Sequence, residues 1–429
     1  MNFRSAFLGF YVLMTSFLPS FGQATSDQQP SSLVGAVDDR SVVISKSFPR
    51  DQNNPSYWLR LREEMKPAWQ KNLLDFGLKH YQPTFTDDRI FLVDEKRVLV
   101  LSTEDGSKVF DQTFDHTVRT ICPVGNLLFL QTGRMGLMGG KSWLIGYDLK
   151  AGKMIWEQEL GKDLDTPLQS DGDSIFVFDQ GAWFLRLRAF GLDGKERWAV
   201  KSKGGPSSPM LFREDRIIYE PIGLHKVVAL DRKSGQEVWE FEKGWGWSDV
   251  SMRGKELLVA SRWVDALNIS GGVKLIALAA DTGREHWFHR LPADDSLFSR
   301  ELVYGFTSND QVGILQTSRT ATAYTLEDGR VVWSTKPDKG FDFVERQKLI
   351  VLGDHVLVFQ ANKKKALIDM LSLSDGKRTL RASFEDELIS GVHVLGNRLF
   401  MTFRHGTMVA LPLEAMDAQP ASAGVLGKM

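Results

Sequence analysis

The stretch Ala229-Leu-Asp231-Arg-Lys-Ser-Gly235-Gln-Glu-Val-Trp239 places a large aromatic residue four positions after a turn glycine. The residues before it, Lys226-Val-Val-Ala-Leu230, are mostly apolar and rich in β-branched side chains, which is typical of a β-strand. Glycine supplies the left-handed backbone conformation that tight hairpin turns need. The stretch therefore predicts a strand, a tight turn and a second strand that carries Trp239.

The same unit recurs along the chain. Seven glycines are each followed, four residues later, by a large apolar residue, which is Trp in five cases. Successive glycines are 46, 42, 41, 48, 46 and 47 residues apart. The pairs are Gly106–Phe110, Gly152–Trp156, Gly194–Trp198, Gly235–Trp239, Gly283–Trp287, Gly329–Trp333 and Gly376–Leu380. Trp accounts for only 12 of the 429 residues, so this fixed offset indicates a repeat architecture.

A second series of tight turns, with eight members, interleaves with the first, and an apolar strand such as Ile175–Phe178 follows each turn. These turns are Asp87-Asp88, Gly125-Asn126, Asp171-Gly172, Glu214-Asp215, Gly254-Lys255, Asn309-Asp310, Gly353-Asp354 and Gly396-Asn397. Two turns per repeat divide it into four short strands, here termed A to D from the axis outward. Four such strands make one blade of a β-propeller.

The last repeat, near Glu387–Leu413, lacks a D strand, and a candidate for it stands at the front of the chain. The segment Lys66-Pro-Ala-Trp69-Gln-Lys-Asn-Leu73 carries a Trp that no strand precedes. An open ring would leave strand edges exposed, so we expect this segment to complete the last blade. The predicted fold is all-β: an eight-bladed β-propeller of four-stranded antiparallel blades over residues 66–413, closed by an N-terminal outer strand. A pair of β-sandwiches is the alternative, but sandwiches do not repeat Trp at one offset.

The aromatic residues of the D strands are expected to pack between blades rather than to take part in chemistry. One large ring in each outer strand can wedge against the neighbouring blade and seal the interface. The predicted docking residues are Trp69, Phe110, Trp156, Trp198, Trp239, Trp287 and Trp333.

The terminal segments are not expected to belong to the ring. Residues 1–24 resemble a cleaved signal peptide, with Arg4, an apolar core over Ala6–Leu18 and small residues at Gly22 and Ala24. Residues 25–65 form an expected mobile lead-in with room for one short helix at Tyr57–Met65, and residues 414–429 an expected disordered tail. The prediction is an exported protein of a bacterial periplasm, or a secreted one.

Composition argues against several function classes. The formal net charge is −1, which gives no electrostatic case for nucleic acid or a membrane surface. The single cysteine, Cys122, has no partner for an internal disulfide or a metal site. After the leader no segment reaches 18 apolar residues, so we expect no membrane span. Phosphate-loop, nucleophile-elbow and zinc-ligand spacings do not occur, and we expect no catalytic residue, cofactor or metal.

The segment Ala229–Trp239 resembles the Ala-x-Asp-x-x-x-Gly-x-x-x-Trp docking motif of quinoprotein-type propellers, and Gly146–Trp156 is similar to it with Gly in place of Ala. The resemblance covers about Trp69–Leu413. One branch of that superfamily contains the pyrroloquinoline-quinone dehydrogenases, some of which carry a vicinal cysteine pair that this chain lacks. The other contains non-enzymatic scaffolds, including an eight-bladed lipoprotein of the outer-membrane β-barrel assembly machinery. The length and blade number favour the scaffold branch, although no cysteine near residue 24 offers a lipid anchor.

Candidate binding residues lie in the loops opposite the tight turns, because those loops carry all the variation in length. Arg, Trp and Met are enriched at the centres of protein interfaces. The B–C loops after Gln131 and Ser261, and the pair Trp183-Phe184, place such residues beside glycines. The candidates are Arg134, Met135, Met138, Trp183, Arg262, Trp263 and Leu267. The alternative is that these loops fold down and bury their apolar groups against neighbouring blades.

The D–A connections on the same face are acidic, as at Asp115, Asp249 and Asp342. Such a set suits either a bound cation or basic peptide, or ion pairs between blades. The function predicted for the whole chain is a non-catalytic scaffold that binds protein partners in the cell envelope, as a monomer or as part of a complex. A quinoprotein-like dehydrogenase and a carbohydrate-binding propeller are the alternatives.

Overall fold

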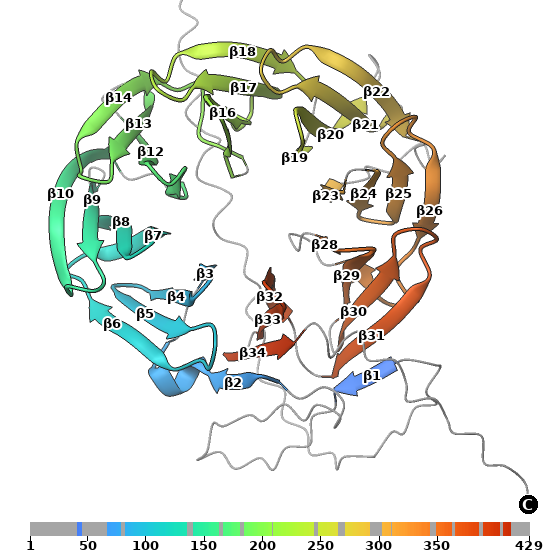
Figure 1. Ribbon diagram of the computed structural model, residues 1–429, viewed down its shortest axis with the longest axis horizontal. Coiled ribbons are helices and arrows are strands. Elements are labelled where there is room, and N and C mark those ends of the chain that lie inside the picture. The colour runs from blue at the N-terminus through green and yellow to red at the C-terminus, as the bar shows by residue number, and fades with distance from the viewer. Residues whose placement is uncertain are drawn as a thin grey trace, which may run out of the picture. The chain divides into compact units, whose positions relative to one another are not determined.

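Antiparallel sheets follow one another around a central axis and make a closed ring (Figure 1). The computed structural model describes residues 41–44, 67–78, 82–134, 140–162, 166–180, 184–207, 209–243, 248–264, 271–291, 303–309, 311–343, 349–362, 365–385, 389–403 and 406–412. Five sheets are single four-stranded blades, and one eight-stranded sheet combines two blades joined by the pair Lys162 and Gln180. A six-stranded sheet is the remaining blade. The expected signal peptide, the expected helix and the expected tail lie outside the described residues.

The first four blades, each given from its inner to its outer strand, follow the chain in order. Blade 1 is β3 (Gln82–Phe85), β4 (Arg89–Asp94), β5 (Arg97–Ser102) and β6 (Lys108–Thr113). Blade 2 is β7 (Thr117–Val124), β8 (Leu127–Arg134), β9 (Lys141–Asp148) and β10 (Lys153–Lys162). Blade 3 is β11 (Gln169–Ser170), β12 (Ser174–Gln180), β13 (Leu185–Gly191) and β14 (Glu196–Lys201). Blade 4 is β15 (Leu211–Arg213), β16 (Arg216–Tyr219), β17 (Lys226–Asp231) and β18 (Glu237–Glu242).

The other four blades complete the ring. Blade 5 is β19 (Ser248–Arg253), β20 (Glu256–Val264), β21 (Gly271–Ala279) and β22 (Glu285–Leu291). Blade 6 is β23 (Val303–Ser308), β24 (Val312–Thr317), β25 (Ala321–Thr325) and β26 (Val331–Thr335). Blade 7 has a divided inner strand, β27 (Asp342–Phe343) and β28 (Ile350–Leu352), then β29 (His355–Ala361), β30 (Lys365–Ser372) and β31 (Arg378–Glu385). Blade 8 is β32 (Ile389–Leu395), β33 (Arg398–Phe403), β34 (Thr407–Pro412) and the N-terminal β2 (Trp69–Asn72).

The ring closes where the sequence predicts. Strand β2 pairs antiparallel with β34, with Trp69 opposite Ala410 and Asn72 opposite Thr407. A short 3-10 helix, η1 (Leu73–Phe76), follows, and the Asn72 side chain accepts a hydrogen bond from the N–H of Leu74 at its start. The predicted all-β, eight-bladed propeller closed by an N-terminal outer strand is therefore confirmed. A second N-terminal strand, β1 (Ser41–Ile44), lies beside β31 of blade 7 and was not predicted.

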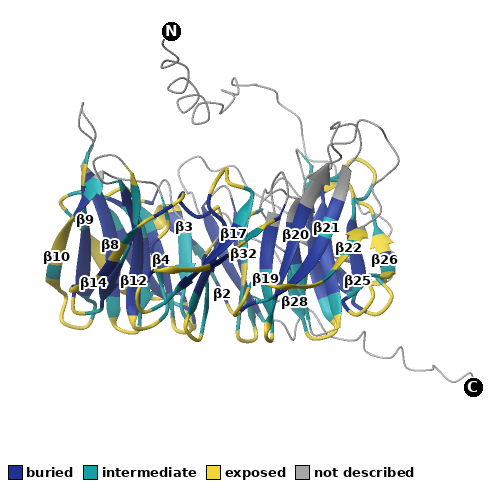
Figure 2. Ribbon diagram, turned by 90° about the horizontal axis from the view of Figure 1, so that it is seen from above, coloured by how far each residue is buried: buried dark blue, intermediate teal, exposed yellow. Residues whose placement is uncertain are grey.

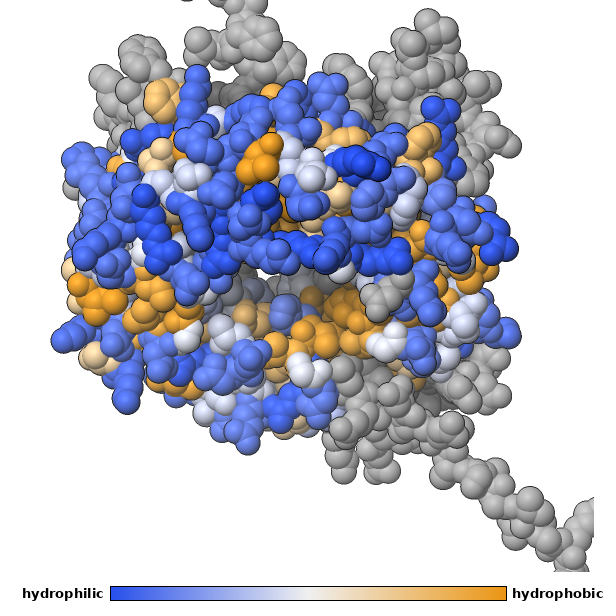
Figure 3. Space-filling model, turned by 45° about the horizontal axis from the view of Figure 1, so that its top comes forward, coloured by the Kyte–Doolittle hydropathy of each residue, from blue (hydrophilic) through white to orange (hydrophobic). Residues whose placement is uncertain are grey.

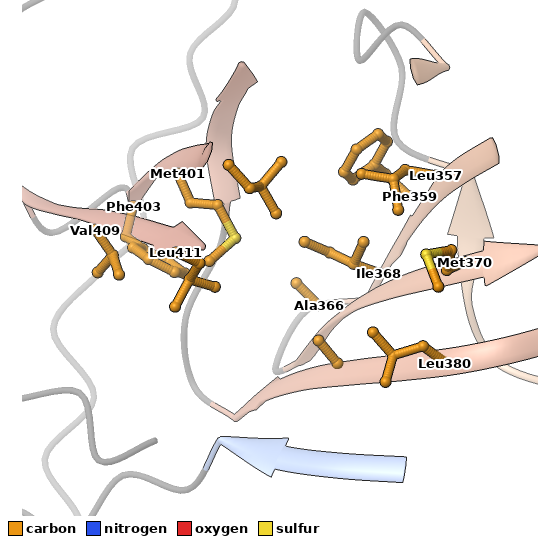
Figure 4. Packing of buried hydrophobic residues seen from close by; sticks show 12 residues of the cluster. Leu357, Phe359, Ala366, Ile368, Met370, Leu380, Met401, Phe403, Val409 and Leu411 are labelled. Atoms are coloured by element: carbon orange, nitrogen blue, oxygen red, sulfur yellow. The ribbon is translucent and has the colours of Figure 1, made fainter. Parts of the chain in front are cut away.

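The core is divided among the interfaces between blades. Among the described residues, buried apolar side chains form eight clusters, and each cluster joins two neighbouring blades. Figure 4 shows the cluster between blades 7 and 8, in which Phe359 and Ile368 face Met401 and Leu411. Side chains alternate along a strand, so every middle strand contributes to two clusters and both of its faces are buried. Continuous apolar runs in the B and C strands follow from this arrangement.

In the part of the chain that the structure describes, five Trp side chains cross from one blade to the next in the same way. Each indole N–H donates to a backbone carbonyl oxygen of the following blade, near its C–D turn. The pairs are Trp69 to Thr103 (2.9 Å), Trp156 to Leu192 (2.9 Å), Trp198 to Arg232 (3.0 Å), Trp239 to Ala280 (3.2 Å) and Trp333 to Leu373 (2.9 Å). The Trp69 bond runs from blade 8 to blade 1, so it fastens the closing strand.

Two of the other interfaces differ. In blade 1, Phe110 packs edge-on against Tyr147 of blade 2, with ring centroids 5.6 Å apart. In blade 5, Trp287 packs against the cluster shared with blade 6, but the ring that lies against the turn glycine Gly329 belongs to His289. The imidazole therefore takes the place that an indole has elsewhere in the ring.

The turn glycine of blade 5 tests how tightly the indole fits. Gly283 has φ +69°, and a Cβ atom there would lie 2.6 Å from the Trp239 ring, whereas Gly254 has φ +53° with nothing within 4 Å. Gly254→Ala should lower the free energy of unfolding by about 1–2 kcal/mol, because it adds backbone strain alone. We expect Gly283→Ala to cost about 1–2 kcal/mol more, because the indole must also move. Thermal denaturation of the two variants measures the difference, and equal midpoints would contradict a close indole contact.

The two faces of the ring differ in construction (Figure 2). The A–B and C–D turns are tight and lie along one face, here called the turn face, where many residues are exposed. The B–C loops and D–A connections lie along the other, the loop face. Within the described part of the chain, the structure contains no helix with the length and hydrophobicity to cross a membrane.

Candidate partner-binding face

Of the residues that the sequence singles out for binding, the structure describes the backbone of Arg134, Arg262 and Trp263, at the loop-face ends of their strands. Arg134 ends β8 and pairs with Lys141, while Arg262 and Trp263 lie in β20 opposite Val273 and Gly272. Their side-chain positions, and the whole of Met135, Met138, Trp183 and Leu267, lie outside the described residues. The two hairpins that carry Arg134, Arg262 and Trp263, β8–β9 and β20–β21, have eight and nine residues in each strand. They reach further toward the loop face than the four-residue β16 does.

Exposed apolar side chains lie on this face at blades 3 and 4. Ile222 and Leu224, in the loop between β16 and β17, are 54% and 38% exposed, and Phe184, just before β13, is 42% exposed. We call Phe184, Ile222 and Leu224 the loop-face patch. The ammonium of Lys201 lies 5.6 Å from the centroid of the Phe184 ring. In Figure 3 polar residues dominate the visible surface, and apolar residues gather in separate groups among them.

Backbone hydrogen bonds fix the loop that carries Ile222 and Leu224. Pro206 and Pro221 form an isolated antiparallel bridge between the connection from blade 3 and the loop of blade 4. The N–H of Ile222 donates to the Gly205 carbonyl at 2.8 Å, and that of Ser207 donates to the Glu220 carbonyl at 2.8 Å. The loop therefore presents its apolar side chains on an ordered backbone, which lowers the entropy cost of binding a partner.

A buried ion pair lies directly beneath this loop. The Lys243 ammonium is 2.8 Å from a carboxylate oxygen of Glu220, and the two side chains are only 6% and 2% exposed. The Ser207 hydroxyl donates to the other carboxylate oxygen at 3.0 Å. Buried charges are retained only when they are paired and hydrogen-bonded. The pair ties the end of β18 to the loop that follows β16.

Ser202 connects the two halves of the patch. Its N–H donates to the carbonyl of Leu185, next to Phe184, at 2.8 Å. Its hydroxyl donates to the Gly204 carbonyl at 2.7 Å and lies 3.2 Å from the Tyr219 hydroxyl, at the base of the blade 4 loop. Burial raises the pKa of Tyr219, so its hydroxyl stays protonated and available for this hydrogen bond.

A buried carboxylate supports the neighbouring interface between blades 2 and 3. Asp179 is fully buried, and Arg186 binds it with two hydrogen bonds of 2.8 and 2.6 Å. Arg188 and the N–H of Gly161, at the end of β10, complete the set at 3.1 and 3.0 Å. Burial opposes ionisation of the carboxyl, but these hydrogen bonds outweigh burial, so the pKa of Asp179 lies below its ordinary value. Gln360, Asp369 and Arg381 form a similar network in blade 7.

Two of the acidic residues predicted for the D–A connections, Asp249 and Asp342, lie instead in the inner strands β19 and β27, and Asp249 makes a contact between blades. The Asp249 carboxylate accepts hydrogen bonds from the N–H groups of Val250 at 3.0 Å and Phe306 at 2.9 Å, and the second links blades 5 and 6. Among the described residues, no group of three or more His, Cys, Asp or Glu side chains could hold a metal ion. Burial raises the pKa of Cys122 to about 12, so this thiol stays protonated at neutral pH.

Reasoning from the sequence pointed to Phe184 and missed Ile222 and Leu224. The Pro221-Ile-Gly-Leu-His225 loop is shorter than the glycine-rich loops that attracted attention, and it contains no Trp, Arg or Met. The one feature of the sequence that could have indicated this site is the pair of apolar residues, Ile222 and Leu224, on either side of Gly223. Their exposure depends on the bridge to Pro206, which no local pattern reveals.

A closed ring of eight blades, with indoles laid against the next blade, defines the class of PQQ-like repeat propellers. The family model described as "Outer membrane protein assembly factor BamB" matches residues 140–294 and 223–385, which together exceed half of the chain. The protein belongs to this family.

Individual relatives are distant. A protein named outer membrane protein assembly factor BamB from Burkholderia pseudomallei is 28% identical over 142 residues, which are 33% of this chain and 35% of the relative. The match thus spans about a third of that relative's length. The crystal structure of BamB from Moraxella catarrhalis has a TM-score of 0.57 at 16% identity and covers 81% of this chain and 99% of its own. The computationally designed Ika8 protein gives 0.54 at 11%, covering 77% and 95%. At these identities the two structures support the fold alone.

Proposed function

We propose that this protein is a non-catalytic scaffold of the cell envelope that binds protein partners in outer-membrane protein assembly. The family's description and the name of the Burkholderia relative both refer to outer membrane protein assembly. We propose a periplasmic location, which agrees with the signal peptide that the sequence predicts for residues 1–24. This location and these partners are proposals.

The observation that carries the proposal is the loop-face patch. Phe184, Ile222 and Leu224 expose apolar side chains at adjoining blades, and backbone hydrogen bonds hold the loop that carries Ile222 and Leu224. Exposed apolar groups on a rigid, hydrogen-bonded backbone commonly act as hot spots of protein interfaces. A ring of polar residues around them would form the rim of such an interface. The long hairpins that carry Arg134 and Trp263 extend the same face and are proposed to add contacts around it.

The patch is tested by crosslinking the tagged protein in cells and identifying the envelope proteins recovered with it. We expect the double variant Ile222→Ser/Leu224→Ser to lose specific partners, with binding weakened by about tenfold or more, as for typical hot-spot residues. Both side chains are exposed, so the variant should fold normally. An unchanged set of partners would contradict the proposed site.

A matched control uses exposed apolar residues elsewhere. Val109 and Val238 are 53% and 43% exposed and lie in the outer strands β6 and β18, away from the loops. The variant Val109→Ser/Val238→Ser removes a comparable amount of apolar surface and should recover the same partners as the wild type. The variant Arg262→Ala/Trp263→Ala then shows whether the β20–β21 hairpin belongs to the same interface. If the control variant loses the partners equally, the loop face has no special role.

A further inference from the structure

Strand β1 lies along the outside of blade 7. Residues Ser41–Ile44 pair in parallel with Arg381–Phe384 of β31, from Ser41 opposite Arg381 to Ile44 opposite Phe384 (Figure 1). Every other strand pair in the described part of the ring is antiparallel. The segment is thus a fifth strand, added to the edge of a blade that is complete without it.

With β1 paired beside it, the middle of β31 is more buried than the outer strands β14 and β18. Ala382 and Ser383 are 1% and 3% exposed, and Leu380 is 8% exposed. The outer strands β14 and β18 each have one buried residue, with exposed or half-buried residues on both sides. Because successive side chains point to opposite faces, both faces of β31 are covered at this point. Its outer hydrogen-bonding edge is the one that β1 meets.

This edge also lacks the density of charge that the outer strand β18 carries. Charged residues on an edge strand discourage pairing with another chain. Strand β18 carries Glu237, Glu240 and Glu242 in six residues. Between Leu380 and Phe384, β31 carries only Arg381, and its guanidinium is turned to Asp369 at 2.6 Å and to Asp338. The edge therefore offers backbone groups without an outward charge beside them.

The occupant has the sequence that such an edge prefers. In the segment Ser41-Val42-Val43-Ile44, the last three residues are β-branched, and Asp39-Arg40 and Ser45-Lys46 flank it. β-Branched residues fit best in strands. Main-chain pairing at an exposed sheet edge is a recurrent mode of peptide recognition.

We propose that the outer edge of β31 is a strand-docking site for an extended, β-branched peptide in parallel orientation, and that residues 41–44 of the same chain occupy it as a strap. Residues 45–66 link the strap to Pro67, where blade 8 begins. The tether gives the strap a high effective concentration at the edge. An extended segment of another protein can bind there only by displacing it. This inference does not depend on the function proposed above.

Hydrogen exchange of the full chain tests the strap. The variant Val42→Pro/Val43→Pro cannot pair, because proline lacks an N–H and does not fit a paired strand. The control Leu33→Pro/Val34→Pro carries the same change outside the strap. We expect the outward-facing amides of 381–384 to exchange about tenfold or more faster in the first variant, and to be unchanged in the control.

A labelled peptide of residues 39–46 supplies the second measurement. It should bind the Val42→Pro/Val43→Pro variant, restore slow exchange at 381–384, and bind the wild type at least tenfold more weakly. Equal exchange in the wild type and the strap variant would overturn the proposal. So would equal binding of a scrambled peptide, or a wild-type dimer in light scattering that the strap variant loses, since the strap would then come from a second copy.

Discussion

Trp239→Ala is expected to lower the free energy of unfolding by about 3–5 kcal/mol, as for other buried aromatic residues truncated to alanine. Trp239 is 8% exposed, packs in the cluster shared by blades 4 and 5, and donates its indole N–H to the Ala280 carbonyl at 3.2 Å. Its removal leaves a cavity against Gly283 and a carbonyl without this donor. The loss falls on an interface between blades, so it weakens the ring and not one sheet alone.

Urea denaturation followed by far-UV circular dichroism measures this effect, because the signal does not depend on the Trp that is removed. The matched control is Val238→Ala, one residue away and 43% exposed, which should change the free energy of unfolding by no more than about 0.5 kcal/mol. Similar denaturation midpoints for the two variants would show that Trp239 does not act as a wedge between the blades.

Asp179→Ala is expected to destabilise the protein by about 3–5 kcal/mol at neutral pH, the usual result of removing one partner from a buried charge network. The carboxylate binds Arg186, Arg188 and the N–H of Gly161, so its loss affects blade 3 and the end of blade 2 together. The control is Glu196→Ala, since Glu196 also binds Arg188 but its side chain is 39% exposed. This control should cost about 1 kcal/mol or less.

The loss of stability caused by Asp179→Ala should depend on pH, because the Asp179 carboxyl stabilises the fold only when it is ionised. The pKa of Asp179 is lower in the folded protein than its ordinary value near 3.9. The carboxylate therefore contributes its full stabilisation above the unfolded pKa and loses it as the pH falls through the folded pKa. The difference in the free energy of unfolding between the wild type and Asp179→Ala should therefore decrease as the pH is lowered from 7 toward 3. A gap that widens on acidification would contradict the ion-pair account.

The fold could be predicted from the sequence because its signal is repeated. Tight turns and a fixed glycine–aromatic offset depend on local geometry, so Gly235 and Trp239 could be interpreted without the rest of the chain. The non-local pairing of Trp69 with blade 8 could also be predicted, because the last repeat lacks an outer strand and the segment around Trp69 is an outer strand without a repeat of its own. His289 in the place of an indole could not be foreseen, since the interface at Gly329 depends on which ring reaches across.

The candidate site was less accessible to prediction. Ile222 and Leu224 are exposed because the Pro206–Pro221 bridge holds their loop, and this contact joins two blades. The buried carboxylates Asp179 and Glu220 gave no signal, because an acidic residue in a strand does not reveal its partner. Strand β1 was assigned to a mobile lead-in, since four β-branched or polar residues without a repeat resemble any short apolar run.

Closure of blade 8 has a consequence for the order in which the protein folds. Strand β2 is the first strand of the ring in the chain, yet its partner β34 is the last. The contact between Arg398 and the Thr103 carbonyl across the same seam joins residues 295 positions apart. Such long-range pairing is slow, because the chain must close a large loop before the contact stabilises it. When the chain is synthesised from its N-terminus, strand β2 with Trp69 has no partner until residues 407–412 are made. The new protein therefore passes through an open ring in which two apolar blade faces are exposed.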